Sequence, residues 1–386
     1  MAQNGMIRNL VESEVEKAGN QFTGYENAGS KVNDLLETGK VRTSDFSFRQ
    51  LFEELVDCPM GADASRVAEA LNSSAFPTIA AKVINKDIID EYNLALGDVG
   101  SLVRESQAMR TDEELVVGFS AGDTTPLLRR QGMAYEETSM GEKNWKIKMA
   151  DFGRMISLTR EVIYEDRTGE VLSRAKDVGR AGGHHKQKMI VETIEATART
   201  AFEEASFGGA HFKGNDITMY SNDHSSLDGQ TNDNLVASNA LVDYTDLEAV
   251  YLAFADMVDE AGDKISIVPK TILIPSALKA TASKIMNSQF LHYGGSNDNV
   301  PSYNPVDDLG GGLNIMSSVF MGDTTTWYMG DFPSQLLGLN VYKPATASQG
   351  ADSELAFTNQ IVARFRWSYH YGIGHTDWRY IIKSTA

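Results

Sequence analysis

The stretch that decides the fold runs from Glu170 to Ala205 and reads EVLSRAKDVGRAGGHHKQKMIVETIEATARTAFEEA. Apolar or small residues recur along it at steps of three and four, and charges of both signs fill the other positions. That spacing is the period of an amphipathic helix. A continuous helix over these residues would be roughly 50 Å long at about 1.5 Å per residue. Such a helix suits a flat, elongated subunit better than a sphere.

Three glycines, Gly179, Gly182 and Gly183, lie within this helical pattern. Each weakens a helix by about 1 kcal/mol relative to alanine. We therefore expect a kink or a close backbone contact at this point of the helix.

The chain before the helix, from Asp112 to Leu158, is predicted to be extended. Leu115–Val117 lead into a turn-rich tip, and Trp145, Ile147 and Met149 then alternate with lysines, which is the period of a strand. We interpret this part as a long, largely polar β-excursion that is too charged on both faces to be core. It is shaped to lie on another surface.

The rest of the chain alternates between helical and extended patterns. Ile79, Val83 and Ile84 begin one helix of a mostly helical N-terminal part. A second α/β segment is predicted after the long helix, with helices 244–260 and 276–288 and strands 271–274, 325–330 and 336–342. The clearest strand runs over 355–371, with Phe365, Trp367, Tyr369 and Tyr371 on one face, and residues 372–377 are expected to turn it back as a hairpin into 378–383.

Composition narrows the class of protein. The net charge is −18, and residues 206–355 hold 18 acids and 6 bases. Clustered Lys and Arg are what bind phosphate backbones, so this balance argues against a dedicated nucleic-acid binder. It suits a protein that stays soluble at high concentration before it assembles. The start of the chain has no apolar run of signal-peptide length and no later window is long enough to span a bilayer, so we expect a cytosolic protein with no membrane partner.

Several residues invite a chemical interpretation, and each has a plainer one. Cys58 is the only cysteine, which excludes intramolecular disulfides and Cys-based zinc sites and favours a buried apolar role. Gly118–Gly122 matches GxSxG around Ser120, but a nucleophile elbow needs a helix directly afterwards, and Asp123–Leu128 read as a loop.

The histidines and the Asn- and Asp-rich loop are possible metal ligands, and each also has a plainer structural interpretation. His184 and His185 are adjacent, about 100° apart on a helix, so they cannot share a metal as an i, i+4 pair could. The Asn- and Asp-rich loop 215–234 could bind Ca²⁺ through oxygens, but it lacks the EF-hand spacing, and these residues are also turn formers. The sequence predicts no cofactor, no metal and no enzymatic activity.

The order of parts resembles the major capsid proteins of tailed bacteriophages, which have the Hong Kong 97 phage capsid fold, and is most similar to the Mu-like major head subunit branch. The resemblance covers roughly residues 110–386. It is carried by Phe152-Gly-Arg-Met-Ile-Ser-Leu-Thr-Arg-Glu161, by Ile163-Tyr-Glu-Asp166 and by Pro269-Lys-Thr-Ile-Leu-Ile-Pro-Ser-Ala-Leu278.

This resemblance implies an α+β fold in five parts. They are an N-terminal arm with helices at 1–110, an extended β-loop at 111–160, a peripheral domain with a spine helix at 161–239, an axial domain at 240–350, and return strands at 351–386. It implies self-assembly through hexamers and pentamers into an icosahedral shell that encloses double-stranded genomic DNA without sequence specificity. A portal, scaffolding or decoration protein would be a further partner. Assembly would take place in the host cytoplasm, and the final location would be the virion capsid.

Candidate intersubunit contacts lie on the extended loop and the spine helix. They are Trp145, Lys146, Lys148, Arg154, Arg160, Arg174 and Arg180. Some relatives are cross-linked through a lysine of the extended loop, and Lys143, Lys146 and Lys148 are candidates, although nothing in the sequence marks one of them. The basic residues of the long helix could face packaged DNA, but a solvated or intersubunit face explains them equally. Two alternatives stay open: the shell of an encapsulin, a bacterial nanocompartment that encloses enzymes, and a serine hydrolase that uses Ser120.

Overall fold

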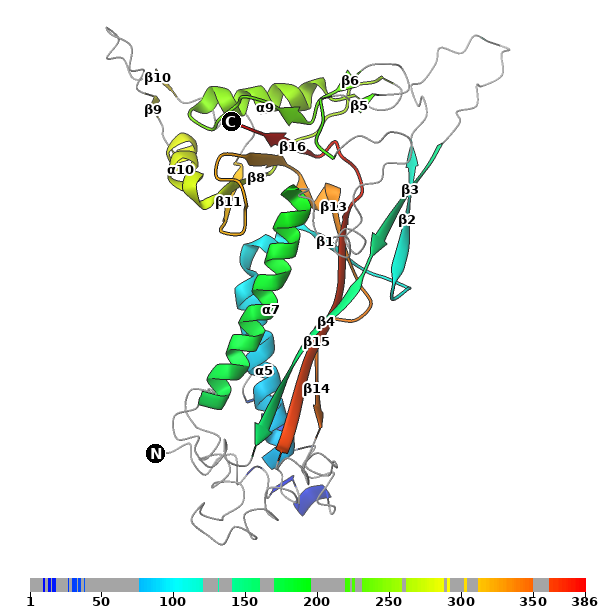
Figure 1. Ribbon diagram of the computed structural model, residues 1–386, viewed down its shortest axis with the longest axis vertical. Coiled ribbons are helices and arrows are strands. Elements are labelled where there is room, and N and C mark those ends of the chain that lie inside the picture. Colours follow the sequence, from blue (N-terminus) through cyan, green and yellow to red (C-terminus); the bar gives the residue numbers. More distant parts are fainter. Residues whose placement is uncertain are drawn as a thin grey trace. The chain divides into compact units, whose positions relative to one another are not determined.

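The structure is a computed structural model, and it describes two compact units (Figure 1). The described residues are 76–120, 131, 141–159, 170–195, 219–222, 224–225, 231–258, 262–287, 290–291, 302–303, 312–349 and 361–386, with isolated positions between 10 and 38. Unit one comprises Met1–Gly97, Asp151–Lys186 and Tyr342–His370. Unit two comprises Asp98–Ala150, Gln187–Val341 and Tyr371–Ala386. Helix α7 (Glu170–Glu195) and strand β15 (Ile361–His375) contribute residues to both units.

In unit one, helix α5 (Phe76–Leu96) lies beside the first part of α7 (Figure 1). A Cβ added to Gly179 would lie 2.3 Å from the carbonyl oxygen of Ile88, and one added to Gly183 would lie 2.6 Å from that of Tyr92. The glycines therefore let two helix backbones approach closely, as the sequence predicted. The predicted helix is confirmed as far as Glu195, and residues 196–205 lie outside the described part.

The strands of unit one are the outer parts of β4 (Ala150–Thr159), β14 (Ala345–Gln349) and β15. β14 is antiparallel to β15, with Ala345 opposite Ser368, and β4 pairs with β15 as well. Phe365, Trp367 and Tyr369 are buried, which confirms the predicted parity of this strand. Trp367 packs on the long helix, since a Cβ added to Gly182 would lie 2.1 Å from its ring.

Unit two contains a five-stranded sheet in the order β11-β8-β12-β16-β7. Its strands are β11 (Asn314–Ser318), β8 (Thr271–Pro275), β12 (Trp327–Gly330), β16 (Ile381–Ser384) and β7 (Leu235–Val236). β8 is parallel to β11 and antiparallel to β12, so the sheet is mixed. Unit two also contains the helices α9 (Tyr244–Asp256) and α10 (Lys279–Asn287). The 3-10 turn η3 (Ser276–Leu278) directly precedes α10.

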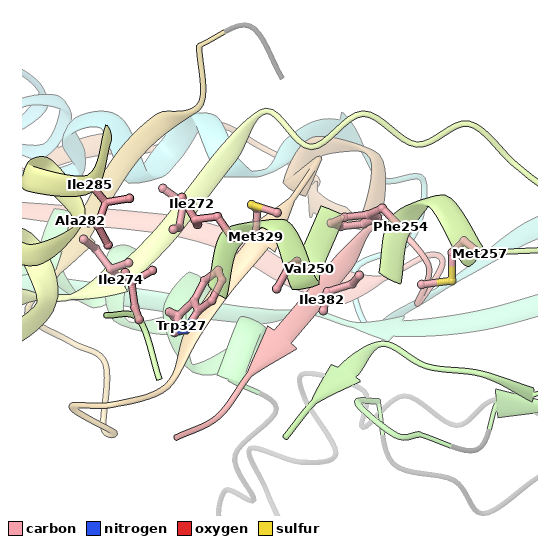
Figure 2. Packing of buried hydrophobic residues seen from close by; sticks show 12 residues of the cluster. Val250, Phe254, Met257, Ile272, Ile274, Ala282, Ile285, Trp327, Met329 and Ile382 are labelled. Atoms are coloured by element: carbon pink, nitrogen blue, oxygen red, sulfur yellow. The ribbon is translucent and has the colours of Figure 1, made fainter. Parts of the chain in front are cut away.

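The main core of unit two joins these helices to the sheet. Figure 2 shows Val250 and Phe254 of α9 packed with Trp327 of β12 and Ile382 of β16. All four side chains are at most 1% exposed. Full burial of a large apolar side chain contributes about 1.5–3 kcal/mol, so this cluster is a main source of the stability of unit two.

A second core of unit two lies where β1 (Arg104–Gln107) runs parallel to β13 (Leu336–Asn340). β13 is also antiparallel to the end of β15. The buried residues of this second core are Ala108, Ile147, Met149, Leu337 and Leu339.

Shorter elements complete the described part of unit two. They are η2 (Gly97–Leu102), β5 (His224–Ser225), β6 (Thr231–Asn232), β9 (Phe290–Leu291), β10 (Ser302–Tyr303) and α11 (Phe332–Gln335).

Two expectations from the sequence are corrected here. The β-excursion is not wholly surface, because Ile147 and Met149 are 1% and 6% exposed and belong to the second core. The C-terminal strand does not turn at Gly372 but continues to His375. It does not form a hairpin with β16 either, since β16 pairs with β12 and β7 in another sheet.

Candidate subunit-contact surface

A two-stranded antiparallel ribbon is the most distinctive feature of unit two. Strands β2 (Glu113–Ser120) and β3 (Gly141–Lys148) pair along their whole length, from Glu113 opposite Lys148 to Ser120 opposite Gly141. Within the described ranges, no third strand joins this pair. Its base is anchored, because Ile147 lies in the second core and Val116 packs against it. A two-stranded ribbon is marginal by itself in water, so its outer part needs support from another surface.

The predicted contact residues lie on three elements. Trp145 and Lys146 are in β3, opposite Val116 and Leu115. Leu115 is 46% exposed, so the ribbon presents apolar surface beside the predicted lysine. Lys148 lies at the base of the ribbon and is half-buried.

The arginines among these predictions lie elsewhere. Arg154 is exposed on β4, Arg174 and Arg180 are exposed on α7, and Arg160 lies outside the described residues. Arg180 is 3.4 Å from Asp177 and 3.4 Å from Glu91 of α5. Exposed ion pairs of this kind contribute little to stability, and they leave the helix surface polar.

The structure places Ser120 in a strand. It is the last residue of β2 and pairs with Gly141. A nucleophile elbow holds its serine on the sharp turn after a strand, so the position of Ser120 inside a paired strand does not favour the hydrolase alternative. Residues 121–130, where the elbow's helix would have to begin, lie outside the described part.

His185 is an exposed residue of α7 that contacts two aromatic side chains. Its Nδ1 atom is 2.7 Å from the hydroxyl oxygen of Tyr369, and its ring lies 4.9 Å from that of Phe152. Burial raises the pKa of the Tyr369 hydroxyl, which therefore remains a proton donor at ordinary pH.

Within the described part of loop 215–234, Asn232 and Asn234 serve the fold. The Asn234 side chain is fully buried, accepts a hydrogen bond from Ser221 N at 2.8 Å, and donates to the carbonyl oxygen of Met219 at 2.8 Å. Asn232 Oδ1 accepts from Val258 N at 3.1 Å. These contacts join residues that are far apart in the sequence, so the two asparagines hold the fold together and do not act as local turn formers.

Two searches of the described residues found nothing. No group of three or more His, Cys, Asp or Glu among them is arranged to hold a metal ion. No helix among them is both long and apolar enough to cross a membrane. Cys58 lies outside the described residues.

Sequence reasoning missed a buried charged cluster at the end of α7. Glu195 is 7% exposed, and its Oε1 accepts a hydrogen bond from Gly322 N at 2.8 Å. Burial raises the pKa of this carboxyl above its usual value. The Lys383 ammonium lies 5.7 Å and 6.0 Å from the rings of Tyr220 and Tyr328, within range of cation–π attraction. The pairing of residues so far apart in sequence gives no local signal.

A second buried polar contact was also missed. His375 Nε2 donates to the carbonyl oxygen of Thr193 at 2.9 Å, and Nδ1 accepts from the side-chain Nε2 of Gln335 at 3.2 Å. Both ring nitrogens are satisfied in the neutral state, and burial lowers the pKa of His375 to about 4. This histidine joins the end of β15 to Thr193 and Gln335.

The features of the described part are those of a structural subunit: a ribbon without a third strand, exposed arginines on strand and helix, and buried polar groups that serve packing. Residues 144–384 match the family described as phage capsid protein, which is more than half of the chain. The chain therefore belongs to this family of phage capsid proteins and is a structural protein of the phage capsid.

Comparison with solved structures finds shell proteins of low sequence identity. One is the capsid of the native GTA particle, computed with C5 symmetry. The match has 10% sequence identity and a TM-score of 0.48, and it covers 75% of this chain and 90% of that chain. The capsid of Ralstonia phage GP4 has 11% identity, with 73% and 86% covered and a TM-score of 0.48. A virus-like particle from Pyrococcus furiosus has 12% identity, with 79% and 99% covered and a TM-score of 0.46. No curated protein sequence matches the chain. The family assignment rests on the sequence match alone.

Proposed function

We propose that the chain is the major capsid subunit of a tailed phage, that it has the Hong Kong 97 phage capsid fold, and that it belongs to the Mu-like branch. Copies assemble through hexamers and pentamers into an icosahedral shell in the host cytoplasm. The shell encloses double-stranded DNA without sequence specificity, and the subunit has no catalytic role. Membership of the phage capsid protein family supports this proposal.

In this proposal the five predicted parts keep their boundaries. Residues 1–110 form the arm and its helices, 111–160 the extended loop, and 161–239 the peripheral domain around the spine helix. Residues 240–350 form the axial domain around the symmetry axis of the capsomer, and 351–386 return to the peripheral domain.

The observation that carries the proposal is the β2–β3 ribbon. Its base is fixed in a core by Ile147, but among the described residues each of its two strands pairs only with the other. A neighbouring copy in a closed assembly can bury what one chain leaves exposed. We expect the ribbon to bind its neighbour through three residues. They are Trp145 and Lys146 of β3 and the exposed Leu115, which lies opposite Lys146.

The other proposed contacts are Lys148, Arg154, Arg160, Arg174 and Arg180. The chain has a net charge of −18, so an exposed cation on one copy readily finds an acidic surface on the next. Such complementarity steers association and fixes register more than it adds affinity.

Electron microscopy and light scattering of the purified full chain test this proposal. Closed shells, or capsomers that convert to shells, are the expected result. A protein that stays monomeric over a wide range of salt, pH and concentration contradicts it. Native particles should contain double-stranded DNA that resists added nuclease until the shell is opened, and particles filled with protein cargo instead would favour the encapsulin alternative.

A further inference from the structure

The sheet of unit one has two unlike faces. Phe365, Trp367 and Tyr369 of β15 are buried on the face that packs against the helices. Successive side chains of a strand point to opposite faces, so Arg366 and Ser368 lie on the other face with β4 and β14 on either side. That outer face is hollow.

Small residues make the hollow. Ala345 of β14 lies opposite Ser368 of β15, and Gly153 of β4 lies beside Ser368 on the other side, where an added Cβ would be 3.2 Å from Ser368 Cβ. The three therefore form a row across the strands. In the next row, Ala347 lies opposite Arg366. The resulting groove has a volume of about 600 Å³.

Larger side chains line the rim. Met155 and Tyr342 line the groove and are 58% and 37% exposed, so both present surface to an incoming segment. The Tyr342 hydroxyl donates to the carboxylate of Asp151, so that acid is already engaged within the rim. Arg154 and Arg366 also line the groove and are exposed. Two cations face one engaged acid, in a chain whose net charge is −18.

We propose that this groove, lined by β4, β14 and β15, binds an acid-rich segment of a second copy of the chain. This inference rests on the proposed function, because a shell brings copies into contact. Charge complementarity selects the occupant: Arg154 and Arg366 project from a positive patch, while the chain as a whole carries 53 acids against 35 Lys and Arg. The small residues of the floor admit the backbone of the incoming segment, Met155 and Tyr342 cover its apolar atoms, and the arginines donate hydrogen bonds to its carboxylates.

Photo-crosslinking tests where the groove lies in the assembly. The full chain would carry p-benzoylphenylalanine at Ala347 and be irradiated both in shells and as unassembled protein. We expect a covalent dimer from shells only, with the adduct mapped by mass spectrometry to an acid-rich peptide of the second copy. Shells that give no dimer, or an adduct to a different protein or to nucleic acid, overturn the inference and leave the proposed function intact. If the chain forms no shells at all, both fail.

Charge reversal supplies an independent test. R366E should lower the yield of shells about tenfold, because like charges then face each other across the contact, whereas R366K should stay within about twofold of wild type. K284E is the matched control, since Lys284 is an exposed cation of α10 outside the groove. All variants are first compared as unassembled protein by circular dichroism and thermal unfolding. Equal losses for R366E and K284E, or none for R366E, overturn the inference.

Discussion

Gly179 has no room for a side chain. A Cβ there would meet the carbonyl oxygen of Ile88 at 2.3 Å and its carbonyl carbon at 3.0 Å. Backbone atoms of a helix cannot move aside as a flexible side chain can, so the two helices would have to separate. At this residue the conformational cost of glycine in a helix is offset by close packing of α5 against α7.

G179A is therefore expected to destabilise the protein, although alanine is the better helix former. The propensity gain is about 1 kcal/mol, and overpacking costs about 1–3 kcal/mol, so we expect a net loss of up to about 2 kcal/mol in the free energy of unfolding. Urea unfolding of the unassembled chain, followed by tryptophan fluorescence, measures it.

The control for this prediction is A181G on the exposed side of the same helix. It removes an exposed methyl group, and it should cost about 1 kcal/mol from helix propensity alone. A G179A variant that is more stable than wild type would show that the two helices lie further apart than this structure has them.

His375 makes stability depend on pH. Its folded pKa is about 4, below the usual 6.5, because the ring is buried and neutral. The unfolded chain therefore takes up the proton first as the pH falls. The contribution is complete above pH 6.5 and is lost as the pH falls toward 4, by roughly 3 kcal/mol in full.

The measurement is the free energy of unfolding of wild type and H375Q at intervals from pH 7 to pH 4.5. H375Q is expected to be less stable at pH 7, because it loses the fitted ring, but its stability should change less over this interval. Equal slopes for the two proteins would mean that other groups cause the acid sensitivity.

At the scale of elements, helix α9 shows how local sequence sets a boundary. Asp243 Oδ1 accepts from Thr245 N at 2.8 Å, and Asp246 Oδ2 accepts from Asp243 N at 2.8 Å. This reciprocal capping box satisfies backbone donors that the first turn leaves unpaired. The helix carries Val250 and Phe254 into the core of unit two, so its start also positions that core.

D243A should lower the free energy of unfolding by about 1 kcal/mol, the usual cost of losing an N-cap. D243N keeps an acceptor oxygen and should stay close to wild type. Urea unfolding of the unassembled chain compares the three proteins. Equal losses for D243A and D243N would indicate that the charge of Asp243, and not its hydrogen bond, supports the helix.

Helices and strands whose apolar residues recur with a regular spacing could be predicted from the sequence. The elements against which they pack or pair could not. The long helix, α9, β8 and the buried parity of β15 all follow from the spacing of apolar residues. The end of β15 was predicted wrongly because Gly372 and Gly374 resemble a turn. In the structure, a Cβ at Gly372 would lie 2.4 Å from the carbonyl oxygen of Lys148, and one at Gly374 would lie 2.8 Å from Ile147. These glycines leave room for the end of β3, which contains Ile147 and Lys148. The close approach of two strands that are distant in the sequence cannot be read from the sequence.

The same limit applies to the candidate contact surface. The sequence predicted an extended excursion at 111–160 and named Trp145 and Lys146 on it, and both lie in β3. It did not predict the groove of unit one, because Ala345, Ser368 and Gly153 meet only through the pairing of three distant strands. Small residues carry no sequence signal of their own, so only the register of the strands reveals the hollow.

At the scale of the whole molecule, the structure separates folding from assembly. The base of the ribbon belongs to a core through Val116, Ile147 and Met149. Its outer part makes no described pairing except between β2 and β3. If the outer part exists to bind a neighbour, its removal should spare the fold of one chain and abolish the shell.

A shortened ribbon tests this directly. Residues 118–143 would be replaced by Asn-Gly, so that a two-residue turn joins Val117 to Asn144, which already lie opposite each other. We expect the free energy of unfolding to change by less than about 1 kcal/mol, because the core contacts of the base remain. Electron microscopy and light scattering should show monomers or capsomers in place of shells. A shortened chain that still forms closed shells would mean that residues 118–143 are not a required intersubunit contact, and that any contact of the ribbon is made by the part it keeps, with Leu115, Trp145 and Lys146. A chain that no longer folds would mean that the outer ribbon supports its own unit.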